Sequence, residues 1–561
     1  MIAVWVPPAG ERRVHKKIRR AQWGLVMVLK RLVLSAVLAL GAVSQLSLAT
    51  PASALTFRYA FQGDLNGLDP YTLNETFAQA ALNNIYDGLT RRDENLKIVP
   101  CLAESWEVLN PLQWRFHLRH GVKFAGGEDF TADDVLFSAE RVQQPGSQMT
   151  TKIPAGTKVV KVDDYTVDFI LTTPNPILIA EWDNWMMMSK KWAEANGAEK
   201  PQAASGSQLN AFALKANGTG PFMVVSHEPG VKTVYKPNPN WWDKANKKFN
   251  FDEVVFTTIK SPATRVAALL TGEVDLIEPV PVQDMQRIAD NPTTSVLTGP
   301  ELRTVFLYMD EKRDELLYSS VKGKNPFKDL RVRKAFYEAI DIEAIKTKIM
   351  RGLATPSALL IAPSLYSRSG EFKRLPYDPA DAKKLLAEAG YPDGFELTMH
   401  CPNDRYVNDE AICQAVTSML AKIGIKATLN AMPKAVYFAK AGPAQHYDVS
   451  FGMLGWTPSG LDSWNVIANL AGCRDDNGVG GTFNYGGYCN PKVDELNKQI
   501  LVETDIKKRD ELIAQAYKII SDDVGLLPLH QQALAWGVSK KIKIPLRSDD
   551  EIMFYTANKQ E

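Results

Sequence analysis

Cysteine and histidine are scarce in this chain, which has 5 cysteines and 7 histidines among its 561 residues. No C-x2-C spacing occurs, and the histidines do not cluster beside the cysteines as they do in zinc sites. His117 and His120 lie three residues apart in a segment with strand periodicity, so they face opposite sides of a sheet and cannot bind one metal ion together. We therefore expect neither a metal site nor a cofactor.

The motifs of common enzymes are missing as well. The chain has no G-x-S-x-G nucleophile elbow, no H-E-x-x-H zinc motif and no G-x-x-x-x-G-K-[ST] phosphate loop. A glycine-rich stretch at 478–488 lacks the spacing of a dinucleotide-binding loop, and we interpret it as a loop held between Cys473 and Cys489. His530 is a lone histidine near a strand end, which favours a structural role. These absences argue against an enzyme.

An excess of basic charge is also missing. The formal net charge is +1, but the first 54 residues contribute eight basic residues and only one acidic residue. The rest of the chain carries 57 basic and 63 acidic residues. Because nucleic-acid binding depends on clustered lysine and arginine side chains that neutralise phosphates, we expect no nucleic-acid partner.

The longest apolar run is too short to cross a membrane. It covers residues 32–49, contains several serines and a glutamine, and falls short of the ~20 mainly apolar residues that a span needs. Two basic residues precede it and a small-residue exit ends at Ala54, which is the three-part pattern of a secretory signal peptide. We therefore expect residues 1–54 to be a signal peptide. Met27 would be the more typical start, so we interpret residues 1–26 as a gene-model extension.

The cysteines fit an exported protein. The first of them is Cys101, so none stands at the expected cleavage point to carry a lipid anchor, and we expect a protein free in the periplasm. An oxidising compartment favours disulfides. Two pairs are close in sequence, Cys401 with Cys413 and Cys473 with Cys489, although the sequence alone leaves three pairings of these four open.

Helix and strand patterns alternate along the chain, which predicts an α/β architecture. Residues 378–389 are predicted to form a helix capped by Asp378, and Thr131 with Asp134 predicts a capping box at another helix start. Residues 114–118 alternate between apolar and polar side chains, as strands do. The chain exceeds the about 250 to 300 residues at which a single core stops growing, so we expect two or more lobes.

One turn is unusual in its composition. The segment "WTPSGLDSWN", residues 456–465, follows the apolar run "YDVSFGMLG", which is typical of a buried strand. It combines two tryptophans, Trp456 and Trp464, with a single carboxylate, Asp462. Aromatic side chains and one charge in a turn at a strand end indicate a surface that holds a ligand.

Seven segments of the chain occur in an order that is known from one family. They are "LTFRYAFQGDLNGLDPY", "LAESWEVLNPLQWRFHLRHGVKFAGGEDFTADDVLFSAERV", "GTGPFMVVSHEPG", "NPNWWDKA", "RVAALLTGEVDLI", "NPFKDLRVRKAFYEAIDIEAI" and "YDPADAKKLLAEAGYPDGFEL". The chain resembles the family 5 extracytoplasmic solute-binding proteins, the dipeptide/oligopeptide-binding group of the ABC importers. The resemblance covers essentially all of residues 55–545.

The resemblance implies a two-lobed α/β protein of the periplasmic-binding-protein type. Lobe I would hold residues 55–305, with an inserted subdomain at about 100–210, and would also receive the C-terminal return at 525–561. Lobe II would hold residues 306–524. Two strands would cross between the lobes, which close around a ligand by a hinge motion. A membrane permease would recognise the closed form, a separate ATPase would supply the energy, and the binding protein would be a monomer.

The resemblance also implies two ligand-facing loops in lobe II. In "CPNDRYVND", Arg405 and Tyr406 match an Arg and a Tyr that receive the ligand carboxylate in dipeptide-binding relatives; a surface arginine beside a disulfide is the alternative. The other loop is the "GWT" turn. Relatives carry an Asp two residues after this Thr, which pairs with the α-ammonium of the peptide, whereas this chain has Pro458 and Ser459 after Thr457.

Two interpretations of Asp462 remain open. It either reaches the ammonium position by a different loop path or caps a helix that begins at Ser463. Trp456 and Trp464 are expected to line the cleft, with core packing as the alternative.

The sequence thus predicts a periplasmic receptor of an ABC importer for short peptides or peptide-like solutes. A buried ligand loses its water, so each of its charges needs an opposite charge or a full set of hydrogen bonds. The missing Asp favours an alternative, the same receptor for a solute without a free amine there, such as glutathione, an opine, a sugar or a metal chelate. A secreted hydrolase is the remaining alternative, and it requires turnover by the purified protein.

Overall fold

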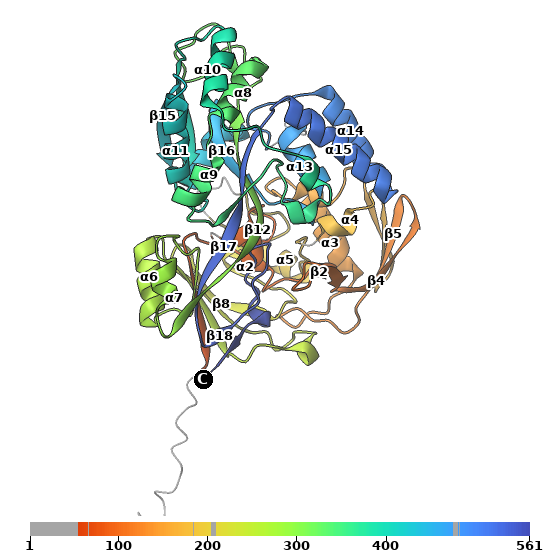
Figure 1. Ribbon diagram of the computed structural model, residues 1–561. Coiled ribbons are helices and arrows are strands. Elements are labelled where there is room, and N and C mark those ends of the chain that lie inside the picture. The colour runs from red at the N-terminus through yellow and green to blue at the C-terminus, as the bar shows by residue number, and fades with distance from the viewer. Residues whose placement is uncertain are drawn as a thin grey trace, which may run out of the picture. The chain divides into compact units, whose positions relative to one another are not determined.

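The computed structural model describes residues 54–65, 67–182, 184–203, 209–474, 481 and 483–560 (Figure 1). Apart from Ala54, the expected signal peptide lies outside these residues, and so do residues 478–480 and 482 of the glycine-rich stretch. Residues 55–561 form one unit of the chain.

A mixed sheet of eleven strands runs through the described residues in the order β15-β14-β16-β12-β17-β11-β1-β10-β9-β8, with β13 paired to β17 outside this order. Pairing is parallel between β1 and both β10 and β11, and between β14 and both β15 and β16; the other pairs are antiparallel. The strands are β1 (Thr56–Phe61), β8 (Phe222–Glu228), β9 (Lys232–Pro237), β10 (Glu253–Thr258), β11 (Leu276–Glu278), β12 (Thr294–Met309), β13 (Ala354–Pro356), β14 (Glu396–Pro402), β15 (Lys426–Met432), β16 (Phe451–Trp456) and β17 (Leu527–Ser539).

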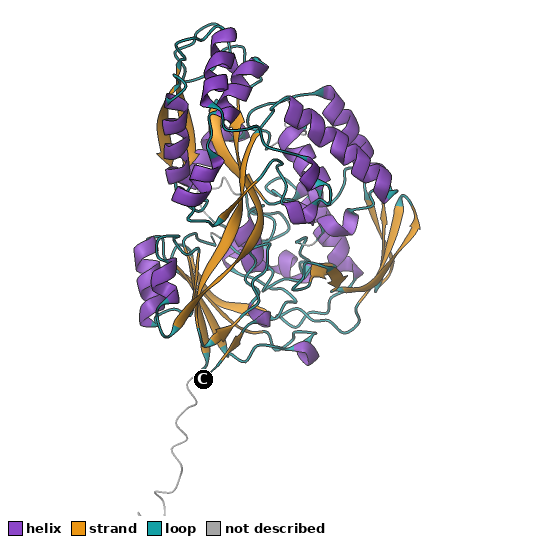
Figure 2. Ribbon diagram, viewed as in Figure 1, coloured by secondary structure: helices purple, strands orange, loops and turns teal. Residues whose placement is uncertain are grey.

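Two long strands, β12 and β17, join the two halves of this sheet (Figure 2). They pair antiparallel from Thr294 with Ser539 to Leu307 with Leu527. At one end β17 pairs with β11, and at the other end β12 pairs with β16. We call the part with β1 and β8–β11 the first half and the part with β14–β16 the second half.

The two halves have separate hydrophobic cores, and the long strands contribute to both. Trp536 of β17 packs with Phe57 and Phe554 in the core of the first half. Leu527, also in β17, packs with Phe336 in a core of the second half. Side chains of β17 therefore pack into the core of the first half near one end of the strand and into a core of the second half near the other end.

A smaller antiparallel sheet belongs to the first half. Its order is β4-β5-β7-β6. The apolar side of β5 is buried, which confirms the strand predicted at 114–118. Phe116 of β5 packs on Trp182, and Phe169 of the neighbouring strand β7 packs on Trp185. The strands of this sheet and of two further pairs are β4 (Ala103–Asn110), β5 (Gln113–Leu118), β6 (Lys158–Asp163), β7 (Thr166–Ile170), β2 (Thr90–Arg92), β3 (Ile98–Pro100), β18 (Ile542–Lys543) and β19 (Asn558–Lys559).

Helices cover both halves, and their ends follow the sequence signals. The side chain of Asp378 accepts hydrogen bonds from the first turn of α10, and Thr131 with Asp134 forms the expected capping box of α3. The helices are α2 (Thr76–Leu82), α3 (Ala132–Val142), α4 (Leu178–Glu181), α5 (Lys190–Asn196), α6 (Pro262–Thr271), α7 (Met285–Ala289), α8 (Leu330–Glu338), α9 (Ile342–Ala344), α10 (Pro379–Glu388), α11 (Asp409–Ala421), α12 (Lys434–Ala441), α13 (Ser463–Val466), α14 (Pro491–Val502) and α15 (Ile506–Asp522).

Disulfide bonds join Cys401 to Cys413 and Cys473 to Cys489, the two pairs that are close in sequence. Cys101 has a free, buried thiol that donates a hydrogen bond to the carboxylate of Asp87. No helix in the described part of the chain has both the length and the apolar character that a membrane crossing requires.

Candidate functional site

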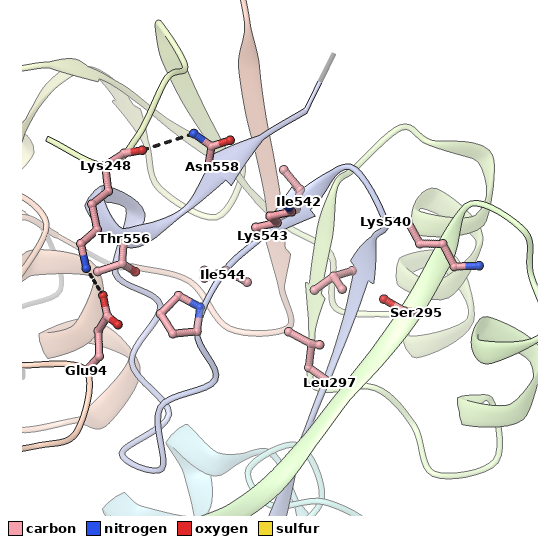
Figure 3. A pocket seen from close by; sticks show the side chains of 12 residues that line it. Glu94, Lys248, Ser295, Leu297, Lys540, Ile542, Lys543, Ile544, Thr556 and Asn558 are labelled. Carbon is pink, nitrogen blue, oxygen red and sulfur yellow. Dashed lines mark hydrogen bonds and ion pairs between the residues drawn. The ribbon is translucent and has the colours of Figure 1, made fainter.

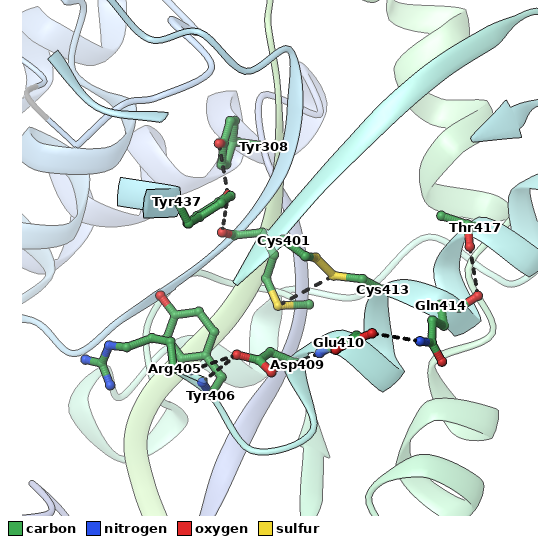
Figure 4. Close-up of a disulfide and its surroundings, with 11 residues drawn as sticks. Tyr308, Cys401, Arg405, Tyr406, Asp409, Glu410, Cys413, Gln414, Thr417 and Tyr437 are labelled. Atoms are coloured by element: carbon green, nitrogen blue, oxygen red, sulfur yellow. Dashed lines mark hydrogen bonds between the residues drawn. A yellow bond between two sulfur atoms is a disulfide. The ribbon is translucent and has the colours of Figure 1, made fainter. Parts of the chain in front are cut away.

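The candidate site residues in the "CPNDRYVND" loop lie between β14 and α11, beside the Cys401–Cys413 disulfide (Figure 4). The Asp409 carboxylate accepts hydrogen bonds from the backbone N–H groups of Arg405 (2.9 Å) and Tyr406 (3.0 Å), which fixes the loop at the helix start. Burial raises the pKa of Asp409 to about 6. The backbone that carries the side chains of Arg405 and Tyr406 is therefore held in place by hydrogen bonds to Asp409.

Tyr406 joins this loop to the neighbouring turn. Its hydroxyl accepts a hydrogen bond from the backbone N–H of Gly455 at 2.8 Å, and the ring is buried. A Cβ atom at Gly455 would lie 2.7 Å from the Tyr406 ring, so only glycine allows this contact. The end of β16 and the loop after β14 are thus held together.

Arg405 contacts the first half of the molecule. Its guanidinium lies 3.4 Å from the carboxylate of Glu75, which also caps α2 by accepting a hydrogen bond from Ala78 N–H at 3.0 Å. Burial alone would raise the pKa of Glu75, but Arg405 and Lys434 outweigh it, and the pKa lies below its ordinary value. Arg405 is therefore a charged bridge between the halves in this structure.

A second charged group lies on β12, where the strand passes between the halves. Arg303 pairs with Glu301 at 2.6 Å, and both side chains are buried. Gln532 of β17 donates a hydrogen bond to the same carboxylate at 2.6 Å. Two buried hydroxyl oxygens, Oγ1 of Thr304 and Oγ1 of Thr457, have no hydrogen-bond partner among the described residues. One carboxylate oxygen each of Glu75 and Glu301 also makes no hydrogen bond within the described residues. Buried polar groups are nearly always bonded, so these oxygens can accept or donate further hydrogen bonds.

The "WTPSGLDSWN" turn is fixed by contacts of its own. Asp462 caps α13 by accepting a hydrogen bond from Trp464 N–H at 2.7 Å. The same carboxylate forms a double ion pair with Arg509 of α15, at 2.8 and 2.7 Å. Both oxygens of Asp462 are therefore bound within the protein, which favours the capping interpretation.

The two tryptophans of the turn are half-buried. Trp456 donates a hydrogen bond to Asn465 at 3.0 Å and packs against the ring of Phe483 at 4.7 Å. Trp464 packs at the edge of a second-half core. Each tryptophan has only part of its surface in the core. Each side chain can therefore pack in the core and also line a cleft.

Ser459 of the same turn bonds to the first half. Its hydroxyl accepts a hydrogen bond from the Lys152 ammonium at 2.7 Å. A further link between the halves runs from the Gln62 amide to the backbone carbonyl of Asp404 at 3.1 Å. Arg405 and the turn residue Ser459 thus contact two first-half residues that the sequence did not indicate, Glu75 and Lys152. Asp462 is bonded to Trp464 and Arg509 instead. Glu75 lies just before an apolar helix, where a side chain can cap the helix start, and this position is the sequence signal that could have indicated Glu75.

A surface pocket of about 590 Å³ lies elsewhere, where the end of β17, the start of β12 and the C-terminal segment meet (Figure 3). Leu297, Val538 and Ile542 contribute apolar surface, and Lys540 and Lys543 lie at its edge. None of the five predicted ligand-binding residues lines this pocket. This pocket is therefore separate from the candidate site.

Comparison with solved structures identifies the fold. The chain superimposes on the periplasmic binding protein DppA of Helicobacter pylori, solved in complex with the peptide STSA, with a TM-score of 0.79 and 25% sequence identity, covering 91% of this chain and 99% of that one. This is the two-lobed α/β fold of periplasmic binding proteins, as expected from the sequence.

Two relatives match over most of their length. The dipeptide-binding protein of Escherichia coli (strain K12) is 26% identical over 528 residues, covering 89% of this chain and 93% of that protein. The glutathione-binding protein GsiB of Salmonella choleraesuis (strain SC-B67) is 28% identical over 515 residues, covering 90% of this chain and 94% of that protein. The model of the bacterial extracellular solute-binding proteins, family 5 Middle, matches residues 97–478. The chain belongs to this family.

Proposed function

We propose that this protein is the periplasmic substrate-binding component of an ABC importer, which binds a short peptide or peptide-like solute between two closing lobes and delivers it to a membrane permease. The observation that supports the proposal is the Arg405–Glu75 ion pair at 3.4 Å, because here a guanidinium of one half already holds a carboxylate of the other half. The names of the dipeptide-binding and glutathione-binding relatives support the solute class.

The lobes of this proposal follow the two halves of the sheet. Residues 55–305, with an inserted subdomain at about 100–210 and the C-terminal return at 525–561, form lobe I, and residues 306–524 form lobe II. The separate cores and the course of β12 and β17 support these boundaries. Closure is a hinge motion about these two strands.

Arg405 and Tyr406 form the carboxylate end of the proposed site. A ligand carboxylate replaces Glu75 as the partner of Arg405, and the charge-assisted bonds to a guanidinium orient it. The hydroxyls of Thr304 and Thr457 supply further hydrogen bonds. Trp456 and Trp464 form apolar walls that tolerate different side chains.

The protein acts by binding alone in this proposal. It catalyses no reaction, requires no cofactor, works as a monomer outside the cytoplasm and does not bind nucleic acid. The described residues contain no group of three or more histidine, cysteine, aspartate or glutamate side chains placed to hold a metal ion. Its protein partner in this proposal is the membrane permease of an ABC importer.

A second candidate is a modified or non-peptide solute in the same receptor. It is favoured by one observation, the double ion pair of Asp462 with Arg509, because this leaves no carboxylate of the turn for a ligand ammonium.

The test is native mass spectrometry of the mature protein purified from its own periplasm. A population of dipeptide or tripeptide masses on the protein supports the first proposal, and a single non-peptide mass supports the second candidate. A bare protein that gains no thermal stability from any compound of a solute panel contradicts both, because a ligand at 100 times its dissociation constant adds about 2.7 kcal/mol. Turnover of a bound solute contradicts the binding-only role.

A further inference from the structure

The pocket of about 590 Å³ on the first half has no role in the proposed function (Figure 3). Leu297 of β12 and Val538 of β17 lie side by side in it, and the segment that follows β17 forms one of its walls. Sites for small molecules have volumes of about 300 to 1,000 Å³. The pocket is therefore large enough for a small molecule, and its lining decides which chemistry fits.

The floor of this pocket is the outer edge of the first-half core. Val538 and Ile542 are core residues with 2% and 6% of their surface exposed, and Leu297 and Ile544 pack against the same core. The floor is therefore apolar and fixed in place. An alkyl or aryl group that covers it removes apolar surface from water, which favours binding.

The charged groups around the pocket leave an excess of positive charge. Three lysines and one glutamate line it, namely Lys248, Lys540, Lys543 and Glu94. Glu94 is neutralised by its ion pair with Lys248. The Lys540 ammonium donates to two backbone carbonyls, and Lys543 has no hydrogen bond or ion pair with a described residue. Two exposed positive charges thus lack a carboxylate partner in the part of the chain that the structure describes.

This local excess is opposite in sign to the charge of the chain after residue 54, which carries 57 basic and 63 acidic residues. An anionic group at the edge of the pocket accepts charge-assisted hydrogen bonds from the ammonium groups, while an apolar tail covers the floor. A cation would meet like charges. A neutral apolar molecule would use the floor alone.

We propose that this pocket is a second ligand site, which binds an amphipathic organic anion, namely a carboxylate with an alkyl or aryl tail. The tail covers Leu297 and Val538, and the carboxylate lies at the edge with Lys540 and Lys543. The site is independent of the cleft between the lobes. Because β12, β17 and the C-terminal segment all line it, the bound anion should also stabilise the folded protein.

The experiment compares three probes that separate the tail from the charge. Octanoate has both, 1-octanol has the tail alone, and acetate has the charge alone. Isothermal titration calorimetry uses the whole mature protein, freed of bound solute by unfolding and refolding. Octanoate should bind roughly tenfold more tightly than 1-octanol, because it adds charge-assisted bonds, and acetate should show no binding at the same concentrations.

Substitutions at the edge and at the floor should act differently on these probes. Lys540→Gln combined with Lys543→Gln should lower the affinity for octanoate to that for 1-octanol and leave the latter unchanged. Lys541→Gln is the matched control, because Lys541 is an exposed lysine of the same segment that does not line the pocket. Leu297→Gln should weaken both octanoate and 1-octanol, and Ile544→Gln repeats this test if Leu297→Gln fails to fold.

Arg405→Ala separates this pocket from the cleft. It removes the carboxylate receptor of the proposed function, so octanoate should bind this variant as tightly as it binds the unchanged protein. Loss of octanoate binding in a folded Arg405→Ala variant overturns the inference, because the anion would then lie in the cleft.

Four further outcomes overturn the inference. They are no binding of octanoate, equal affinity for octanoate and 1-octanol, an unchanged affinity for octanoate in the folded double lysine variant, and co-sedimentation with phosphatidylglycerol vesicles that the double variant loses. In the last case the lysines would serve a membrane surface instead. None of these outcomes contradicts the proposed function, which concerns the solute in the cleft and is tested by native mass spectrometry.

Discussion

At the scale of single residues, the proposed site contains an ion pair that a carboxylate ligand would have to replace. Glu75 already holds the Arg405 guanidinium, so a ligand carboxylate gains the strength of its new bonds minus those of the broken pair. The ion pair also gives each of these two partly buried charges an opposite charge within the protein. Affinity for a carboxylate therefore depends on both members of the pair.

Replacing Arg405 should weaken any ligand that binds through a carboxylate. We expect Arg405→Ala to cost about 2 kcal/mol or more in binding, since a charge-assisted pair is lost. Calorimetric titration with N-succinyl-L-alanyl-L-alanine measures this cost. Glu75→Gln should act in the other direction because it removes the competitor, and Arg331→Ala, an exposed arginine paired with Asp329, is the matched control. Equal affinity of Arg405→Ala and the unchanged protein would remove Arg405 from the site.

Replacing Asp462 should lower stability and leave affinity unchanged. Asp462→Asn keeps a capping oxygen but loses the double ion pair with Arg509, so we expect a loss of about 1 to 3 kcal/mol in the free energy of unfolding. Asp505→Asn is the matched control, because Asp505 caps α15 without an arginine partner. Urea unfolding measures both. A loss of affinity confined to free-amine ligands would instead assign the ammonium role to Asp462.

A buried carboxyl pair makes stability depend on pH. Tyr59 donates a hydrogen bond to Glu278 at 2.9 Å, Glu278 is hydrogen-bonded to Asp550, and burial raises the pKa of Glu278 to about 7. The folded protein thus keeps a proton that the unfolded chain loses above about pH 4.5. The contribution of Glu278 to stability is present below pH 4.5 and is lost as the pH rises towards 7.

The variant Glu278→Gln should therefore gain stability relative to the unchanged protein as the pH rises from 4.5 to 7, by up to about 3 kcal/mol. Urea unfolding at half-unit steps of pH measures the difference. Glu396→Gln, at the exposed start of β14, is the control and should show no such slope. A difference that stays constant over this range would mean that Glu278 is ionised throughout.

At the scale of elements, the turn after β16 shows how a short segment can serve two neighbours. It caps α13, and it also lies against the end of α4 from the other half. Gly460 makes this contact possible, since it adopts a positive φ and has no Cβ atom.

A methyl group at Gly460 should loosen this contact. We expect Gly460→Ala to be destabilising through backbone strain and through the short contact with Ala180. Gly230→Ala is the matched control, because Gly230 has a similar φ of +76° and nothing lies within 4 Å of its added Cβ atom. The excess loss of Gly460→Ala over Gly230→Ala in thermal unfolding measures the contact between the halves, and equal losses would show that strain alone matters.

The elements could be predicted well where the signal is local. The caps at Asp378 and Thr131 and the alternation along β5 depend on residues a few positions apart, and the structure confirms them. The contact of Lys152 with Ser459 could not be predicted, because 307 residues separate the partners and no periodic pattern links a lone lysine to a lone serine. The structure therefore adds the contacts between site residues that are far apart in the sequence, whereas the local helices and strands could already be predicted.

At the scale of the whole molecule, the C-terminal segment is part of the first half. Phe554 is buried in the core that contains Phe57, and its N–H donates a hydrogen bond to Asn84, 470 residues earlier. Arg547 pairs with Asp549 and bonds to the carbonyls of residues 92 and 93.

Removal of residues 546–561 should therefore prevent the first half from folding. We expect the shortened protein to lose its cooperative thermal transition, because the loss of Phe554 alone costs several kcal/mol of buried apolar contact. Circular dichroism melting measures this. Removal of residues 1–54 is the control and should leave the transition intact. A shortened protein with an unchanged transition would show that the segment is dispensable.

The course of β17 has a consequence for the order in which the chain folds. This strand lies between β12 and β11 in the middle of the sheet, yet it is formed by residues near the end of the sequence. Contacts between residues far apart in sequence form slowly, because a long loop must close first. The second half can assemble around β14, β15 and β16 before β17 pairs with β11. The half that begins the sequence is the one that is completed last.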